Sequence, residues 1–181
     1  MRHPLLNKHL LISLIFITAI LLLPLYSQDL PDGYRSIRLG MSLEEVKNAL
    51  VSDAVFGYRG ERDVSLLPDQ EKVLIETEGP SFLSRCWFQF HDQKLYIITI
   101  TMNEELMDYY SLFKTLFDKY GQPESLSPEI VIWEDNTTRM SLERPLTVKY
   151  LDVAVYNSLL NSSQVNQSAG EFSRQKFLES F

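Results

Sequence analysis

Two neighbouring strand patterns joined by a two-residue polar turn constrain the fold of this chain more than any other feature. Residues 85–91 read RCWFQFH and alternate in polarity, and Lys94–Met102 reads KLYIITITM, a composition typical of a strand. Asp92-Gln93 between them is far too short for a parallel crossover, so the strands pair as an antiparallel hairpin. The apolar face of that hairpin requires a covering layer.

Two predicted helices supply this layer. The first runs from Leu43 to Val51, and a capping box formed by Ser42 and Glu45 marks its start. The second begins with the cap and acids of Asn103–Glu105 and ends at Gly121. Its inward face is predicted to be a stripe of aromatic and leucine side chains: Leu106, Tyr109, Tyr110, Phe113, Leu116, Phe117 and Tyr120. Such a stripe is typical of a core face.

Further strand patterns flank these helices. They are Val55–Arg59, Lys72–Glu78, Glu129–Glu134, Thr138–Glu143 and Leu146–Tyr156. The expected order is therefore α-β-β-β(-β)-α-β-β-β, because the links between strands are short. We predict an α+β fold: an antiparallel sheet of about six to seven strands with two helices packed on one face, preceded by an N-terminal signal or transmembrane helix.

The N-terminus has the three-part pattern of a secretory signal. A basic segment with Arg2 and Lys8 precedes the apolar run Leu10–Leu25, and Ser27 is the small residue expected before a cleavage site. Cleavage after Ser27 is the favoured interpretation. The alternative is an uncleaved anchor, in which residues 10–25 hold the domain at the outer side of the inner membrane. Both predict an exported protein of the periplasm or cell envelope.

The chain divides into three parts by composition. Residues 1–27 are the signal peptide or anchor, 28–156 form a single α+β domain that opens with a lead-in over 28–38, and 157–181 form a polar tail. The tail is rich in Asn, Ser and Gln, which bury little surface, and is predicted to be disordered.

Charge narrows the range of partners. Residues 1–27 hold two basic and no acidic residues, so the remaining 154 residues carry 15 Lys and Arg against 24 Asp and Glu, a net charge of −9. A negative charge of this size argues against a nucleic acid or an anionic membrane surface as partner. Contact with a membrane is expected only through residues 10–25, if these remain attached.

The sequence lacks a recognisable catalytic or metal-binding set. His91 is the one histidine after the signal and is expected on the surface beside a turn, while Cys86 is expected to be buried on a strand. The acid pairs Glu104/Glu105 and Glu134/Asp135 are the only material for acid–base chemistry, yet they stand at a helix start and a strand end, where acids are common. We therefore predict no catalytic residues, no metal ligands and no cofactor.

Two stretches resemble a known group of proteins. Residues 39–46 read LGMSLEEV, and residues 116–123 read LFDKYGQP and lead into Trp133-Glu134-Asp135 and Val148-Lys149-Tyr150. These motifs resemble small bacterial envelope domains, namely the outer-membrane assembly lipoproteins of the SmpA/OmlA type and the β-lactamase-inhibitor-like domains. The resemblance covers residues 37–152, and it implies a protein-binding or assembly module without catalytic residues.

The leading functional hypothesis is an exported, non-enzymatic binding or envelope-assembly module whose partner is another envelope protein. Its sheet face or the loop at residues 57–70 is the expected binding surface. A second hypothesis is an inhibitor or regulator of an exported enzyme, and a third is a hydrolase that uses the paired carboxylates.

Overall fold

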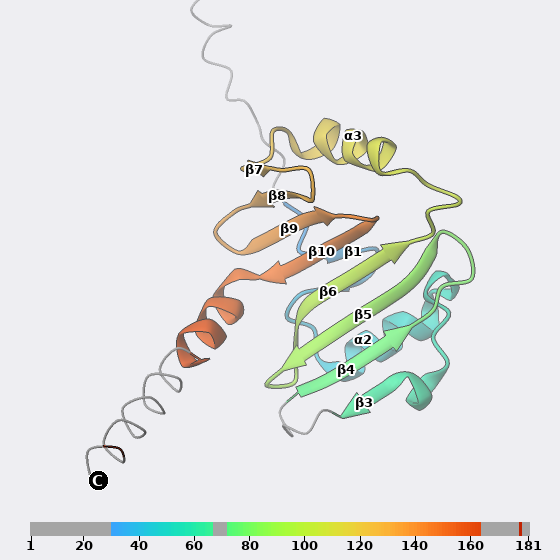
Figure 1. Cartoon of the computed structure of the whole chain (residues 1–181). Helices are drawn as coiled ribbons and strands as arrows, with labels where there is room; N and C mark the ends of the chain where they lie inside the picture. Colours follow the sequence, from blue (N-terminus) through green and yellow to red (C-terminus); the bar gives the residue numbers. More distant parts are fainter. Residues whose placement is uncertain (1–29, 67–71, 164–177, 179–181) are drawn as a thin grey trace, which may run out of the picture.

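The computed structural model describes residues 30–66, 72–163 and 178, and its main element is one large sheet (Figure 1). The strands of this sheet are β3 (Val64–Leu66), β4 (Lys72–Thr77), β5 (Leu83–His91), β6 (Lys94–Met102), β7 (Ser125–Leu126), β8 (Ile130–Glu134), β9 (Thr138–Glu143) and β10 (Thr147–Asp152). They lie in the order β3-β4-β5-β6-β10-β9-β8-β7, and neighbouring strands are antiparallel. The predicted α+β class and antiparallel sheet are confirmed, but the sheet has eight strands because the very short β3 and β7 were not predicted.

The predicted hairpin is the centre of the sheet. β5 and β6 pair from Leu83↔Met102 to His91↔Lys94, and the turn residues Asp92 and Gln93 have φ of 48° and 60°. These left-handed conformations give the tight turn the twist that matches the flanking strands. The alternating side chains of β5 that were predicted to face inward are buried, and Phe88 is 0% exposed.

The helix α2 (Leu43–Ser52) has the predicted start. The Ser42 backbone N–H donates to Glu45 Oε2 at 2.7 Å, and the Glu45 N–H donates to Ser42 Oγ at 3.4 Å. Val46 and Leu50 are buried against the sheet, as their helical spacing predicts.

The helix α3 (Tyr109–Tyr120) begins six residues after Asn103, so the predicted start is wrong. The reason is a stronger cap further on: Asp108 Oδ1 accepts from the Ser111 N–H at 2.9 Å and Oδ2 from its hydroxyl at 2.6 Å. Asn103 instead closes a turn by accepting from the Glu105 N–H.

The predicted aromatic stripe of α3 is correct only in part. Leu116 and Tyr120 are buried, and Phe113 packs against the Trp133 ring with the centroids 6.4 Å apart. Leu106 and Tyr110 of the predicted face are 51% and 70% exposed. The later helix start removes Leu106 from the helical register.

The predicted strand Val55–Arg59 is absent. Residues Ala54–Phe56 and Gly60–Asp63 form two short 3-10 helices instead. The turn between them passes close to another backbone, since a Cβ at Gly57, whose φ is 63°, would lie 2.1 Å from the Glu78 carbonyl oxygen. A strand cannot follow that path.

The lead-in is structured. β1 (Gly33–Tyr34) and β2 (Ile37–Arg38) form a separate two-stranded hairpin, and Ile37 is 0% exposed in the core. Two-residue strands have too few alternating positions to give a sequence signal.

The last predicted strand, Leu146–Tyr156, is too long, because β10 ends at Asp152 and a helix follows. Residues 153–163 are helical, so the first part of the tail predicted to be disordered, 157–163, is ordered in a helix (Figure 1). Asp152 Oδ1 accepts from the Val155 N–H at 2.9 Å, which caps this helix where β10 ends. Apart from Leu178, the rest of the tail lies outside the described residues, as do the predicted signal at 1–27 and its run at 10–25.

Tyr156 of the helix at residues 153–163 lies beside Arg139 on one side of the sheet, whereas Val46 and Leu50 of α2 and Phe113 of α3 pack on the other. In Figure 1, α2 lies behind the sheet, and α3 lies near the end formed by β7 and β8. The β1–β2 hairpin also packs on the side of α2 and α3, where Tyr34 meets the ring of Phe56, and Phe56 in turn meets Phe88 of β5. Within the described ranges, no helix has the length and apolar character needed to span a membrane.

Candidate functional site

The structure places the sequence-predicted chemical residues apart from one another. The His91 side chain is 22% exposed, less than expected of a surface residue, and its Nδ1 is buried without a hydrogen-bond partner. Its Nε2 lies 3.6 Å from Asp92 Oδ2, beside the hairpin turn. His91 thus has only one nearby carboxylate, and no nucleophile is paired with it in the described part of the chain.

The two acid pairs have structural roles or none. Glu134 forms an ion pair with Arg139 across β8 and β9, and Asp135 Oδ1 accepts from the backbone N–H groups of Thr137 and Thr138, both at 2.8 Å. Partial burial acts to raise the pKa of Asp135, but the hydrogen bonds from Thr138 and Thr137 together outweigh it and lower the pKa. Glu104/Glu105 is exposed before α3.

Cys86 is buried, as predicted. It is 0% exposed on β5, and burial raises the pKa of its thiol to about 12. A thiol of that pKa is a packing group rather than a nucleophile. Across residues 30–66 and 72–163, no cluster of three or more His, Cys, Asp or Glu side chains could hold a metal ion.

The side of the sheet turned away from α2 and α3, which we call the open face, is the strongest candidate surface. Strand alternation puts these side chains on it: Trp87, Gln89, Ile97, Thr99, Ile130, Ile132, Glu134, Arg139, Ser141, Glu143, Lys149 and Leu151. They form rows across the strands, because Gln89 pairs with Ile97 and Ile97 with Leu151. In the next row, Lys149 pairs with Ser141 and Ser141 with Ile132.

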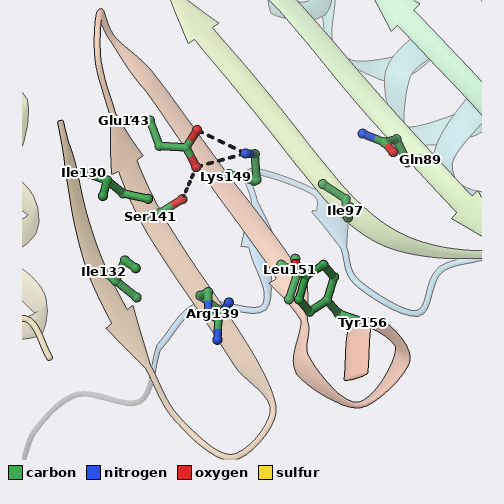
Figure 2. Close-up of a pocket in the computed structure, with 10 residues that line it drawn as sticks. All are labelled: Gln89, Ile97, Ile130, Ile132, Arg139, Ser141, Glu143, Lys149, Leu151 and Tyr156. Atoms are coloured by element: carbon green, nitrogen blue, oxygen red, sulfur yellow. Dashed lines mark hydrogen bonds and ion pairs between the residues drawn. The ribbon is translucent and has the colours of Figure 1, made fainter. Parts of the chain in front are cut away.

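A pocket of about 310 Å³ lies on the open face over β8, β9 and β10 (Figure 2). Its apolar lining is Ile97, Ile130, Ile132, Leu151 and Tyr156. The hollow has a simple cause: the small side chain of Ser141 stands between the long ones of Arg139 and Glu143 on the same strand. The pocket has room for one apolar side chain of a partner or for a small ligand.

Ion pairs stand at the border of this pocket. Lys149 Nζ lies 2.9 Å and 3.1 Å from the two oxygens of Glu143, which also accepts from the Ser141 hydroxyl at 2.8 Å (Figure 2). Arg139 pairs with Glu134, and its guanidinium lies 5.9 Å from the ring centre of Tyr156. These side chains are about one-third exposed, with Lys149 at 33%, so they can meet polar groups of a partner.

The Gln89 side chain completes the pocket. It lines the cavity, and its amide makes no hydrogen bond within the described residues. A free amide can both donate and accept, so it is suited to a peptide group. The arrangement therefore offers an apolar hollow, one free amide and a charged border.

Comparison with known proteins places the chain in a family. The profile of the TP0088 domain matches residues 32–162. The chain belongs to the TP0088 domain family. No curated protein and no solved structure matches it. The TP0088 domain match begins next to β1 and continues into the helix after β10, so the family unit includes the hairpin and the C-terminal helix that the sequence patterns missed.

The sequence predicts the sheet face as a binding surface but not the pocket that lies on it. The alternation of β8, β9 and β10 carries the signal for an outward face, since Ile130 and Ile132 alternate with buried Val131 and Trp133. The strand order β10-β9-β8, which brings Ile132 beside Ser141, becomes visible only in the fold.

Proposed function

We propose that this TP0088 domain protein is an exported, non-enzymatic binding or assembly module of the bacterial envelope, and that another envelope protein docks on the open face. The signal-like N-terminus supports export. The resemblance of residues 39–46 and 116–123 to the SmpA/OmlA-type and inhibitor-like envelope domains supports the role in binding.

The apolar patch of Ile97, Ile130 and Ile132 within the open face is the observation that carries the proposal. A solvated face of an antiparallel sheet is normally polar. Here Ile97, Ile130 and Ile132 are only partly buried around a hollow, and neither α2 nor α3 covers them; the helix at residues 153–163 contributes Tyr156 to the lining of this hollow. An apolar patch with a charged border is typical of a protein-binding surface, in which one pocket receives an anchor side chain.

The edges of the sheet are poorer docking sites than its face. The edge strands β3 and β7 have three and two residues, so each offers few free backbone groups to an added strand. Short edges are a common protection against strand pairing. A partner that binds this sheet would therefore use side chains on the open face.

Site-specific photocrosslinking in the native cell tests the proposal. A photoreactive phenylalanine replaces Trp87 or Tyr156 at the open face and, as the matched control, Tyr110, an aromatic residue of α3 that is 70% exposed. We expect one discrete crosslinked envelope protein from the first two positions and none from the third. Ser141→Val, which fills the hollow, should reduce that crosslink strongly, whereas Ser65→Val on the exposed edge strand should not.

The outcomes separate the alternatives. If the crosslinked species is an exported enzyme whose activity falls in the complex, the role is that of an inhibitor or regulator. Equal crosslinking from all three positions, or none from Trp87 and Tyr156, contradicts docking on the open face. A hydrolytic activity of the purified chain that disappears when Glu134 or Glu104 is changed to Gln would contradict the non-enzymatic role.

A further inference from the structure

A second cavity lies on the other side of the sheet, between the β1–β2 hairpin and the last turns of α3. Its volume is about 520 Å³, within the range of small-molecule sites. We call it the hairpin pocket; the side chains that matter in it are Tyr34, Arg35, Arg38, Lys119, Tyr120 and Tyr150. Tyr150 belongs to β10 and faces the core side, so this pocket and the open face are separated by the sheet.

Two buried tyrosines leave their hydroxyls without protein partners here. Tyr120 is 8% and Tyr150 6% exposed, yet neither hydroxyl makes a hydrogen bond within the described residues. Neither oxygen is among the fully enclosed unpaired atoms, so both remain open to the cavity that the two residues line. Each hydroxyl can therefore bond a group that enters the cavity.

The Tyr150 hydroxyl is a hydrogen-bond donor over the physiological range. Its pKa is raised, first by burial and then by the neighbouring Tyr120 and Tyr34, so it stays protonated. A protonated phenol that has no internal acceptor can donate to a ligand that brings one.

The charged side chains of the hairpin pocket are mostly cations, in a chain whose net charge is −7. Arg35 Nε is paired with Asp53 Oδ2 at 2.5 Å, and Arg38 Nε with Asp32 Oδ1 at 3.1 Å. Arg38 Nη1 also donates to the backbone carbonyls of Arg35 and Ile37, at 2.6 Å and 3.1 Å, so the Nη2 of Arg38 and the terminal nitrogens of Arg35 are the further donors.

Lys119 is the cation with the fewest internal partners. Its Nζ lies 5.1 Å from the centre of the Tyr120 ring, and no acid pairs with it in the part of the chain that the structure describes. Its ammonium group is thus held beside the cavity by an aromatic ring and remains available to an anion.

We propose that the hairpin pocket binds a small organic oxyanion, a carboxylate or a phosphate ester attached to a ring. The phenol O–H groups and the cations are donors, which suit an oxyanion and not a cation or an amine. The rings of Tyr34, Tyr120 and Tyr150 form apolar walls for the uncharged body of the ligand. This site does not depend on the open face, and the two proposals can fail separately.

Calorimetric titration of the purified full chain tests the site with four probes: phenyl phosphate, benzoate, inorganic phosphate and the neutral benzyl alcohol. We expect at least one ring anion to bind with a Kd below about 1 mM. Inorganic phosphate and benzyl alcohol should each bind about tenfold more weakly or not at all, because inorganic phosphate lacks the ring and benzyl alcohol lacks the negative charge. Tighter binding of phenyl phosphate than of benzoate identifies the ligand as a phosphate ester, and the reverse order identifies it as a carboxylate.

Three variants locate the binding. Tyr150→Phe removes only the hydroxyl and should weaken the binding of the ring anion about tenfold or more, since a hydrogen bond to a charged group is lost. Lys119→Gln should weaken it about fivefold, while Lys114→Gln on the outer side of the same helix should leave it unchanged.

The folded state should tolerate Tyr150→Phe, because the hydroxyl has no protein partner to lose, and an unchanged unfolding midpoint would confirm this. Failure of both ring anions to bind, or binding that Tyr150→Phe does not weaken, overturns the proposal. Inorganic phosphate binding as tightly as phenyl phosphate would overturn it as well.

Discussion

Ser141 shows how much of the candidate site depends on a single residue. It is 4% exposed, and the hollow forms above it because its side chain is shorter than those of its neighbours in the pocket. A pattern of polar and apolar positions does not distinguish Ser141 from Arg139 or Glu143, which share its face. The shape of the pocket therefore depends on the size of the side chain at one position of β9.

The cap at Ser42 supports a prediction about stability and pH. Ser42→Ala removes a hydroxyl that accepts from the Glu45 N–H and donates to its carboxylate, and should lower the free energy of unfolding at pH 7 by about 0.5–2 kcal/mol. Hydrogen bonds from Ser42 lower the pKa of Glu45 from its ordinary 4.5. A carboxyl group whose pKa is lower in the folded chain than in the unfolded chain stabilises the folded state at any pH above its unfolded-state pKa. This stabilisation is lost as the pH falls through the folded-state pKa.

Urea unfolding between pH 7 and pH 3 measures this effect. The stability gap between the parent chain and Ser42→Ala should be largest at pH 7 and should narrow below pH 4.5. Ser65→Ala, at an exposed position of β3, serves as the control and should show no gap. A gap that stays constant over the whole range would contradict the hydrogen bond from the Ser42 hydroxyl to the Glu45 carboxylate.

The burial of Cys86 supports a prediction about the reactivity of its thiol. Because its thiol is 0% exposed and its pKa is raised to about 12, a disulfide reagent should modify the native chain only as fast as the chain opens. Kinetics of Ellman's reagent at pH 8 check this, with the urea-unfolded chain as the fully reactive reference. Rapid stoichiometric reaction of the folded chain would contradict the burial.

Among the secondary-structure elements, those with long alternating patterns were predictable and the short ones were not. The bounds Lys94–Met102 and Thr138–Glu143 were predicted as they are observed, because each strand gives several inward and outward positions. β1 and β7 have two residues each and exist because neighbouring segments pair with them. The pocket lining could not be predicted, since it depends on the strand order.

The start of α3 gives a prediction at the element scale. Asp108→Ala removes both hydrogen bonds to Ser111 and should lower the thermal midpoint, because the first turn of α3 loses its cap. Glu104→Ala is the matched change at the start that the sequence suggested, and should have little effect because Glu104 lies in a turn outside the helix. Differential scanning calorimetry of both variants decides between the two starts. A larger fall in the thermal midpoint for Glu104→Ala than for Asp108→Ala would contradict the observed start of α3.

The whole molecule is asymmetric across its sheet. The helices α2 and α3, the 3-10 turns and the β1–β2 hairpin cover the core side, and the other side presents Ile97, Ile130 and Ile132 around a hollow that Tyr156 also lines. An apolar patch on the side of the sheet opposite α2 and α3 is the reason for our proposal that a partner docks there. The family match over 32–162 spans this whole arrangement.

Export is a prediction at the scale of the whole chain. Intact-mass measurement of the protein from fractionated native cells should give the mass of residues 28–181 in the periplasmic or envelope fraction, because Ser27 precedes the expected cleavage site. A full-length species in the inner membrane would indicate the uncleaved anchor, and a full-length species in the cytoplasm would contradict export.

Covalent footprinting of the open face in isolated envelopes is the most direct test of the account. A carbene label would be compared between envelopes and the purified chain, at the β8 peptide carrying Ile130 and Ile132 and at the α3 peptide carrying Tyr110. Docking predicts several-fold lower labelling of the β8 peptide in envelopes, unchanged labelling of the α3 peptide, and recovery of the β8 labelling in Ser141→Val. Equal labelling of the β8 peptide in envelopes and in the purified chain would contradict a partner on the open face.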